Sequence, residues 1–194
     1  SAKKAEGEGL KVMGIAEAAA WRYHELDELL AETDLKTNPI LLILDGVEDP
    51  HNLGALLRTG ECAGVAGVIL PRRRSAQLTE TVSRVSMGAI ETIKVARVGN
   101  LAQTLDRLQD AGFWIAAADM SGKNFWQVKW DFPVALILGG EGSGVSRLLK
   151  EKSDYIVSIP TFGEINSLNV SVAGAVLLYE ILRSRSQGHG ISCN

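Results

Sequence analysis

Short apolar runs alternate with stretches of helical periodicity from residue 40 onward. The runs are four or five residues long and rich in aliphatic and β-branched side chains. They are almost continuously apolar, which is typical of strands buried on both faces of a parallel sheet. We predict strands at residues 40–44, 67–70, 92–96, 114–118, 134–138 and 155–159.

Helical patterns fill the intervals between these runs. The clearest start signal is Asp49 followed by Pro50, a capping residue and then proline at the first helical position. We predict helices at residues 50–63, 77–86, 101–111, 145–152 and 168–185. Alternating strands and helices predict an α/β domain, with a mostly parallel six-stranded sheet flanked by helices and joined by right-handed crossovers.

The two ends of the chain differ from this pattern. Residues 1–37 hold one short apolar run, an alanine stretch and a charged helical piece at 24–31. This is too little to fold alone, so we expect a linker, a docked arm or the remnant of another domain. Residues 186–194 are rich in glycine and serine and predict a disordered tail. The globular domain is therefore expected at residues 38–185.

Composition narrows the class of protein. The chain has 194 residues, 46% of them hydrophobic, and a formal net charge of −3. The mild acidity argues against a generic polyanion binder, so any contact with nucleic acid must come from local patches. No apolar run is long enough for a membrane helix, and the N-terminus lacks a signal-peptide core. Two distant cysteines and three histidines form neither a disulfide framework nor a metal site, so we expect a cytoplasmic protein without a metal.

One candidate site segment follows the first predicted strand. A polar loop leads into a helix that carries Asn52 in its first turn and Arg58 six residues later. Gly54 lies on the same helix face as Arg58 by i, i+4 spacing, which would leave room above the guanidinium. An ordinary surface arginine is the alternative, and spacing alone does not exclude it.

A glycine-rich loop follows the fifth predicted strand. Glycines at such a junction let backbone N–H groups approach a ligand closely, and Glu141 lies among them. A dinucleotide fingerprint belongs to the first strand–helix turn, with an acidic residue at the end of the next strand. Here the loop comes late, and the strand at 155–159 ends in no acid, so an ordinary Rossmann site is disfavoured. A solvated loop carboxylate is the alternative for Glu141.

Surplus polarity marks the start of the last predicted helix. Asn166, Ser167 and Asn169 crowd a position where one capping side chain would suffice. The excess indicates that some of these side chains face a ligand, against plain redundancy in a turn. Because ligands of α/β proteins bind outside the carboxyl ends of the strands, this loop and the two preceding segments could share one site.

Arg72, Arg73 and Arg74 form the clearest basic cluster, directly after the second predicted strand. In an acidic chain they are a candidate phosphate-binding track for RNA, with a solvated charge run as the alternative. The tryptophans at 114, 126 and 130 are expected in core or dimer packing.

Three segments together resemble a known family. DPHNLGALLRT (49–59), LILGGEGSGV (136–145) and IPTFGEINSLNVSVAGA (159–175) look like the three motifs of the SpoU, or TrmH-type, RNA 2′-O-ribose methyltransferases of the SPOUT superfamily. They occur in the family's order. Within the family the chain most resembles the bacterial 23S rRNA guanosine-2′-O-methyltransferases. The resemblance implies a C-terminal deep trefoil knot that forms the S-adenosylmethionine pocket, and a homodimer as the active unit.

The resemblance also assigns site residues by position. Gly139, Ile159 and Leu168 would contact the cofactor largely through backbone groups, and Asp119 and Met120 would form another wall. The full expected cofactor set is Ala118, Gly139, Gly140, Gly142, Ile159, Leu168 and Val170. The residues expected to be catalytic or to shape the site are Asn52, Arg58, Glu141, Ser167 and Asn169.

The chain departs from the family pattern in small ways. Gly140 stands where the family commonly has Asn, Ala or Ser, and Thr161-Phe162 replaces a Met-containing pair. Residues 5–30 look like the join to an N-terminal L30e-like RNA-binding domain, which we expect to be absent from this chain. The expected substrate is a guanosine of 23S rRNA. A tRNA methyltransferase and a catalytically silent cofactor- or RNA-binding homologue are the alternatives.

The resemblance makes Arg58 the favoured base for the 2′-hydroxyl, which is chemically awkward because a guanidinium is effectively always protonated. Either burial and a phosphate relay make Arg58 basic, or it stays charged and polarises the hydroxyl. We favour the second version.

Overall fold

The computed structural model describes residues 21–186. The predicted tail at 187–194 and most of the predicted N-terminal arm lie outside these residues, as does Cys193. The sheet has six strands in the order β3-β2-β1-β5-β4-β6, and all of its strand pairs are parallel. The α/β prediction is confirmed. The strands are β1 (Ile40–Asp45), β2 (Gly67–Pro71), β3 (Val95–Val98), β4 (Trp114–Asn124), β5 (Val134–Gly139) and β6 (Tyr155–Ser158).

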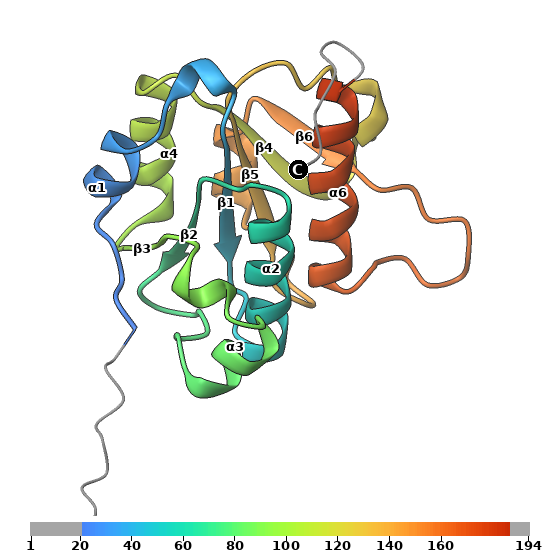
Figure 1. Cartoon of the computed structure of the whole chain (residues 1–194). Coiled ribbons are helices and arrows are strands. Elements are labelled where there is room, and N and C mark those ends of the chain that lie inside the picture. Colours follow the sequence, from blue (N-terminus) through green and yellow to red (C-terminus); the bar gives the residue numbers. More distant parts are fainter. Residues whose placement is uncertain (1–20, 187–194) are drawn as a thin grey trace, which may run out of the picture.

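Helices cover both faces of the sheet (Figure 1). The first helical turn of α2 forms as predicted, with the Asp49 carboxylate accepting a hydrogen bond from the His51 backbone N–H at 2.9 Å and Pro50 at the first position. The helices are α1 (Leu26–Ala31), α2 (Pro50–Cys62), α3 (Glu80–Val85), α4 (Leu101–Asp110), α5 (Arg147–Lys152) and α6 (Val170–Ser186). Three 3-10 turns, η1 (Leu35–Thr37), η2 (Ala89–Glu91) and η3 (Phe125–Gln127), complete the described elements.

The central strands are buried on both faces, as their continuous apolarity predicts. Alternate residues of β1 enter different cores: Leu42 and Leu44 pack with α2 and α6, and Leu41 and Ile43 pack with α1, α4 and α5. Figure 1 shows α2 and α6 on one side of the sheet and α1 and α4 on the other. Two apolar layers therefore fix the sheet between them and hold the carboxyl ends of its strands at one edge.

Two predicted strands differ from the observed ones. The strand expected at 92–96 begins at Val95, because Gly88 (φ 86°) opens η2 and the chain is still turning at residue 92. Ile90 and Ile93 are buried in the core beside α2. These positions are apolar because the turn packs against the core, and not because they pair in the sheet. The strand expected at 114–118 continues to Asn124, with its pairing to β6 interrupted between Ala118 and Lys123.

The segment before β1 is docked on the sheet. Leu26 and Leu29 of α1 are buried in the second core. Gly67 lies directly beneath Leu29, where an added Cβ would come within 2.4 Å of the leucine Cδ1. The boundary expected at residue 38 stays a prediction, as does the trefoil knot. Within the described residues no helix is long and apolar enough to cross a membrane.

Candidate active site at the carboxyl ends of the strands

A cavity of about 780 Å³ opens at the carboxyl edge of the sheet. Its walls come from residues 118–120 within β4, from the ends of β5 and β6 and the loops that follow them, and from the first turns of α6. All seven residues expected to contact the cofactor line it: Ala118, Gly139, Gly140, Gly142, Ile159, Leu168 and Val170. The fold therefore gathers residues from three distant parts of the chain around one space, although their roles stay predictions.

The glycine loop after β5 folds tightly against its own neighbours. A Cβ on Gly139 would lie 1.9 Å from the carbonyl carbon of Gly144, and a Cβ on Gly140 would lie 1.9 Å from the carbonyl oxygen of Gly46. These two glycines thus permit close approach of backbone to backbone. Gly142 (φ 84°) differs, because nothing lies within 4 Å of its Cβ position. Of the three, Gly142 leaves the most open space for a ligand.

Asp45 anchors the glycine loop from the end of β1. Its backbone carbonyl accepts from the Gly140 N–H at 2.8 Å, and its carboxylate accepts from the Ser146 N–H, also at 2.8 Å. We did not single out Asp45 from the sequence. An acidic residue at the end of a buried strand is the signal that could have identified it.

The loop between β6 and α6 leaves its backbone free. Every residue from 161 to 169 is exposed, and no backbone–backbone hydrogen bond involves residues 160–168 within the described chain. Figure 1 shows this orange segment reaching away from the sheet before it returns to α6. Because unpaired N–H and C=O groups are strong hydrogen-bonding groups, the loop can offer them to a ligand.

A single side chain caps α6. The Asn169 Oδ1 accepts from the Ser171 N–H at 2.9 Å and from the Val172 N–H at 3.4 Å. Asn166 and Ser167 make no side-chain hydrogen bond among residues 21–186, and both line the cavity. Of the three polar side chains at this helix start, only Asn169 is used for capping. Asn166 and Ser167 are therefore in surplus, as the sequence indicated.

Asn169 also joins the three segments that the sequence singled out. Its Nδ2 donates to the Asn52 Oδ1 at 2.9 Å and to the Glu141 Oε1 at 2.7 Å. The Asn52 Nδ2 donates to the same Glu141 oxygen at 3.3 Å. Asn52 is buried, whereas Glu141 and Asn169 are exposed, so this polar cluster lies at the cavity rim. Glu141 is thus engaged by two amides, which argues against a merely solvated carboxylate.

Arg58 lies outside the cavity wall. It is exposed and makes neither an ion pair nor a side-chain hydrogen bond within the described part of the chain. The expectation that Gly54 makes room for Arg58 is wrong: Gly54 is buried against α3, where an added Cβ would lie 2.7 Å from the Val85 Cβ. Gly54 therefore serves the packing of α2 on α3, and the guanidinium is free to meet a substrate from solvent.

An ion pair holds Asp119 in the cavity wall on the β4 side. The Lys150 Nζ of α5 donates to the Asp119 Oδ2 at 2.8 Å. Burial by itself would raise the pKa of Asp119, but hydrogen bonds from Lys150 and Ser121 outweigh it and lower the pKa to about 2. The carboxylate is therefore ionised at neutral pH. The resemblance placed Asp119 in a wall, but the sequence did not indicate its partner.

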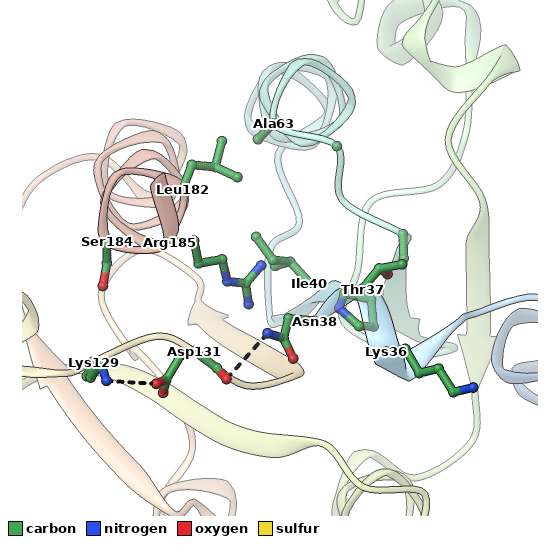
Figure 2. Close-up of a pocket in the computed structure, with 13 residues that line it drawn as sticks. Lys36, Thr37, Asn38, Ile40, Ala63, Lys129, Asp131, Leu182, Ser184 and Arg185 are labelled. Carbon is green, nitrogen blue, oxygen red and sulfur yellow. Dashed lines mark hydrogen bonds and ion pairs between the residues drawn. The ribbon is translucent and has the colours of Figure 1, made fainter. Parts of the chain in front are cut away.

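A second cavity, of about 930 Å³, lies at the opposite edge of the sheet (Figure 2). Arg185 extends into it from α6 and donates to the backbone carbonyls of Trp130 and Phe132, each at 2.8 Å. Burial lowers the pKa of Arg185 to about 10. This cavity adjoins the amino ends of β1 and β5, whereas ligands of α/β sheets bind at the carboxyl ends. None of the predicted site residues lines it.

The cavity at the carboxyl edge fits S-adenosylmethionine by chemistry. Apolar side chains from Leu138, Val157 and Val170 can pack against an adenine ring, and the free backbone of residues 160–168 can bind its nitrogens. The carboxylates of Asp119 and Glu141 suit a ligand that carries positive charge. No group of three His, Cys, Asp or Glu side chains that could hold a metal occurs within residues 21–186.

Residues 39–179 match the SpoU rRNA Methylase family. The chain is 45% identical over 174 residues to YacO of Bacillus subtilis (strain 168), by name a TrmH family tRNA/rRNA methyltransferase, and covers 70% of its length. A protein of the same description from Staphylococcus aureus (strain COL) is 46% identical over 169 residues. That similarity spans 86% of this chain and 68% of the relative.

Solved structures share the fold. An AdoMet-bound rRNA methyltransferase from Sinorhizobium meliloti superposes with a TM-score of 0.76 at 28% identity, over 88% of this chain and 62% of that one. A TrmH/SpoU tRNA modifying enzyme from A. aeolicus gives a TM-score of 0.72 at 29% identity, over 83% and 81% of the two chains. These similarities to SpoU and TrmH proteins exclude the ordinary Rossmann alternative for the glycine loop.

Proposed function

Because the chain belongs to the SpoU rRNA Methylase family of S-adenosylmethionine-dependent RNA methyltransferases, we propose that it methylates a ribose 2′-hydroxyl in RNA. The proposed substrate is a guanosine of 23S rRNA, with a tRNA ribose as the second candidate. The polar cluster of Asn52, Glu141 and Asn169 at the cavity rim carries the proposal. The cluster joins one residue from each of the three segments of the family resemblance. It lies at the rim of the cavity, where the acceptor ribose would have to meet the methyl donor.

The chemistry needs positioning more than covalent participation. S-adenosylmethionine supplies an electrophilic methyl group when bound. Gly142, Ile159 and Leu168 hold it through their place in the cavity wall, and the rim cluster orients the acceptor ribose. Ser167 lines the same wall, and no histidine of residues 21–186 lines that wall with it to activate it as a nucleophile, so we assign Ser167 to ribose binding.

Arg58 acts on the acceptor from outside the cavity. Its exposed side chain supports the version in which it stays charged, polarises the 2′-hydroxyl and contacts a phosphate. The proton then passes to phosphate or water. The alternative, in which burial makes Arg58 basic, has no support from its exposed position.

Methyl transfer to defined RNAs tests the proposal. The chain is incubated with isotopically labelled S-adenosylmethionine and either 23S rRNA or tRNA, and the modified nucleotide is mapped by mass spectrometry. We expect a ribose methyl group that makes the adjacent phosphodiester resistant to alkaline hydrolysis. Methylation of a base, or none of either RNA, would contradict the proposed reaction. If the chain methylated tRNA in preference to 23S rRNA, the proposed reaction would stand and only the proposed RNA substrate would change.

Arg72, Arg73 and Arg74 support the RNA assignment by their position. All three are exposed and follow β2 at the same edge of the sheet as the cavity. The Arg74 Nη2 lies 3.8 Å from the Cβ position of Gly46, in the turn after β1 that the glycine loop approaches. We propose that the cluster binds phosphates of the RNA beside the acceptor.

Reversal of these three charges to glutamate should weaken RNA binding about 10- to 100-fold at low salt and reduce the salt slope by about two to three. The control is a double reversal of Lys36 and Lys129, both exposed at the opposite edge of the sheet (Figure 2). Binding is measured by fluorescence anisotropy over a salt series. An unchanged slope in the arginine variant, or an equal loss in the control, would refute the phosphate track.

We also propose a homodimer, as the resemblance implies. Exposed apolar side chains support it: Phe162, Ile165, Val172 and Tyr179 are all at least 48% exposed, on the loop before α6 and on α6 itself. Such residues mark interaction surfaces. Trp114 and Trp126 are also about half exposed, whereas Trp130, the third tryptophan expected in core or dimer packing, is in the core. Light scattering should give twice the chain mass; a monomer at micromolar concentration would contradict the proposal.

A further inference from the structure

We propose that Asp119 binds the ribose hydroxyls of the adenosyl group of the methyl donor. The sequence shows no acid in the position that a Rossmann fingerprint requires, after the strand that follows the glycine loop. In the fold, however, β4 is the neighbour of β5, and Asp119 comes directly after the first paired part of β4. A carboxylate therefore stands beside the glycine loop although it precedes that loop in the sequence.

A break in the β4–β6 ladder brings Asp119 to the cavity. Both Ala118 and Lys123 face Val157 of β6, so residues 119–122 bulge out of the pairing. The bulge is held by the Ser158 hydroxyl, which donates to the Gly122 carbonyl at 2.9 Å. Gly122 is needed there, because an added Cβ would lie 2.4 Å from the Ile156 carbonyl group. The bulge is thus a fixed structure that directs Asp119 into the wall.

The carboxylate is held in place and still has capacity to accept. Ser121 donates to Oδ1 through its N–H at 3.0 Å and its hydroxyl at 2.6 Å, and Lys150 donates to Oδ2. An ionised carboxylate has about four acceptor positions, so these three bonds leave room for a hydroxyl. The Asp119 side chain is 20% exposed, and this residue lines the cavity.

The distance across the sheet suits an adenosyl group. Asn52 follows β1, and Asp119 follows the first paired part of β4, with β5 between the two strands. The ends of these paired segments therefore lie about 10 Å apart at the usual strand spacing. The methyl group must be presented to the rim cluster beside β1. The ribose then lies on the β4 side, where a cis-diol is a natural partner for a carboxylate.

Calorimetric binding of three ligands tests this role: S-adenosylhomocysteine and its 2′-deoxy and 3′-deoxy analogues. In the unaltered chain, loss of the bonded hydroxyl should weaken binding about 10- to 100-fold, since the acceptor is charged. In Asp119→Ala the parent ligand should bind more weakly, and the difference between parent and deoxy ligand should fall to about twofold. Asp119→Asn, which keeps the shape, should lie between.

Asp106→Asn is the matched control. Asp106 of α4 pairs at 2.5 Å with Lys152 of α5, the helix that also carries Lys150, but Asp106 lies outside the cavity. This variant should discriminate between the ligands as the unaltered chain does. Equal weakening of all three ligands by Asp119→Ala would assign Asp119 a structural role and overturn the inference, as would undiminished discrimination. The inference rests on use of an adenosyl cofactor, and failure of the unaltered chain to bind any of the ligands would contradict that premise directly.

Discussion

Arg58→Ala should lower the rate of methyl transfer by about a thousandfold while S-adenosylmethionine binds with unchanged affinity. The expected size follows from the loss of a charged group that acts on the reacting hydroxyl, together with its phosphate contact. Cofactor affinity should not change, because Arg58 lies outside the cavity and makes no side-chain contact that holds its wall. Single-turnover transfer to RNA and calorimetry with the cofactor measure the two quantities separately.

Two further variants sharpen this test. Arg58→Lys keeps the positive charge but loses the planar, two-pronged hydrogen-bonding group, and should remain at least about tenfold impaired. Arg84→Ala removes an exposed arginine from the neighbouring helix α3 and should transfer methyl groups normally. If Arg58→Ala kept more than a tenth of the normal turnover, the proposed role of Arg58 would be contradicted. A loss that weaker cofactor binding fully explains would contradict it as well.

Asn169→Asp should lower methyl transfer about 100- to 1000-fold with little change in stability. A carboxylate at position 169 can still cap α6, since aspartate and asparagine are comparable N-caps. It cannot donate, however, and it would stand against the Glu141 carboxylate, which now accepts from the Asn169 Nδ2 at 2.7 Å. The rim cluster should therefore open while the helix start survives. Thermal unfolding and single-turnover kinetics report the two effects.

Gly163→Asp is the control for charge. It introduces the same negative charge in the same loop, at an exposed position outside the cavity wall where nothing lies within 4 Å of an added Cβ. It should retain activity within about tenfold. Asn169→Ala should remove both the helix cap and the amide bridge. Loss of the cap should lower the free energy of unfolding by about 1 kcal/mol. If Asn169→Asp were as active as Gly163→Asp, the amide bridge would have no part in the reaction.

The local pattern of the sequence was enough for the architecture. Continuous apolar runs predict strands buried on both faces, and Leu41 to Leu44 divide between the two cores as that pattern requires. The start of α2 at Asp49 and Pro50 could also be predicted from the sequence, because a helix cap depends only on adjacent residues. The β3 boundary was not, because Ile93 is apolar for packing beside α2 and not for pairing in the sheet.

The contacts of the site could not be predicted in the same way, because they join residues that are far apart in the chain. The sequence by itself determined which polar residues were in surplus, namely those of the loops after β1, β5 and β6. Only the tertiary structure decided that the Asn169 amide meets Asn52, 117 residues earlier, and Glu141, 28 residues earlier. Only the strand order β1-β5-β4 places Asp119 beside the glycine loop. Periodicity and capping record the surroundings of each residue along the chain, whereas strand order depends on non-local pairing and packing, which no local pattern encodes.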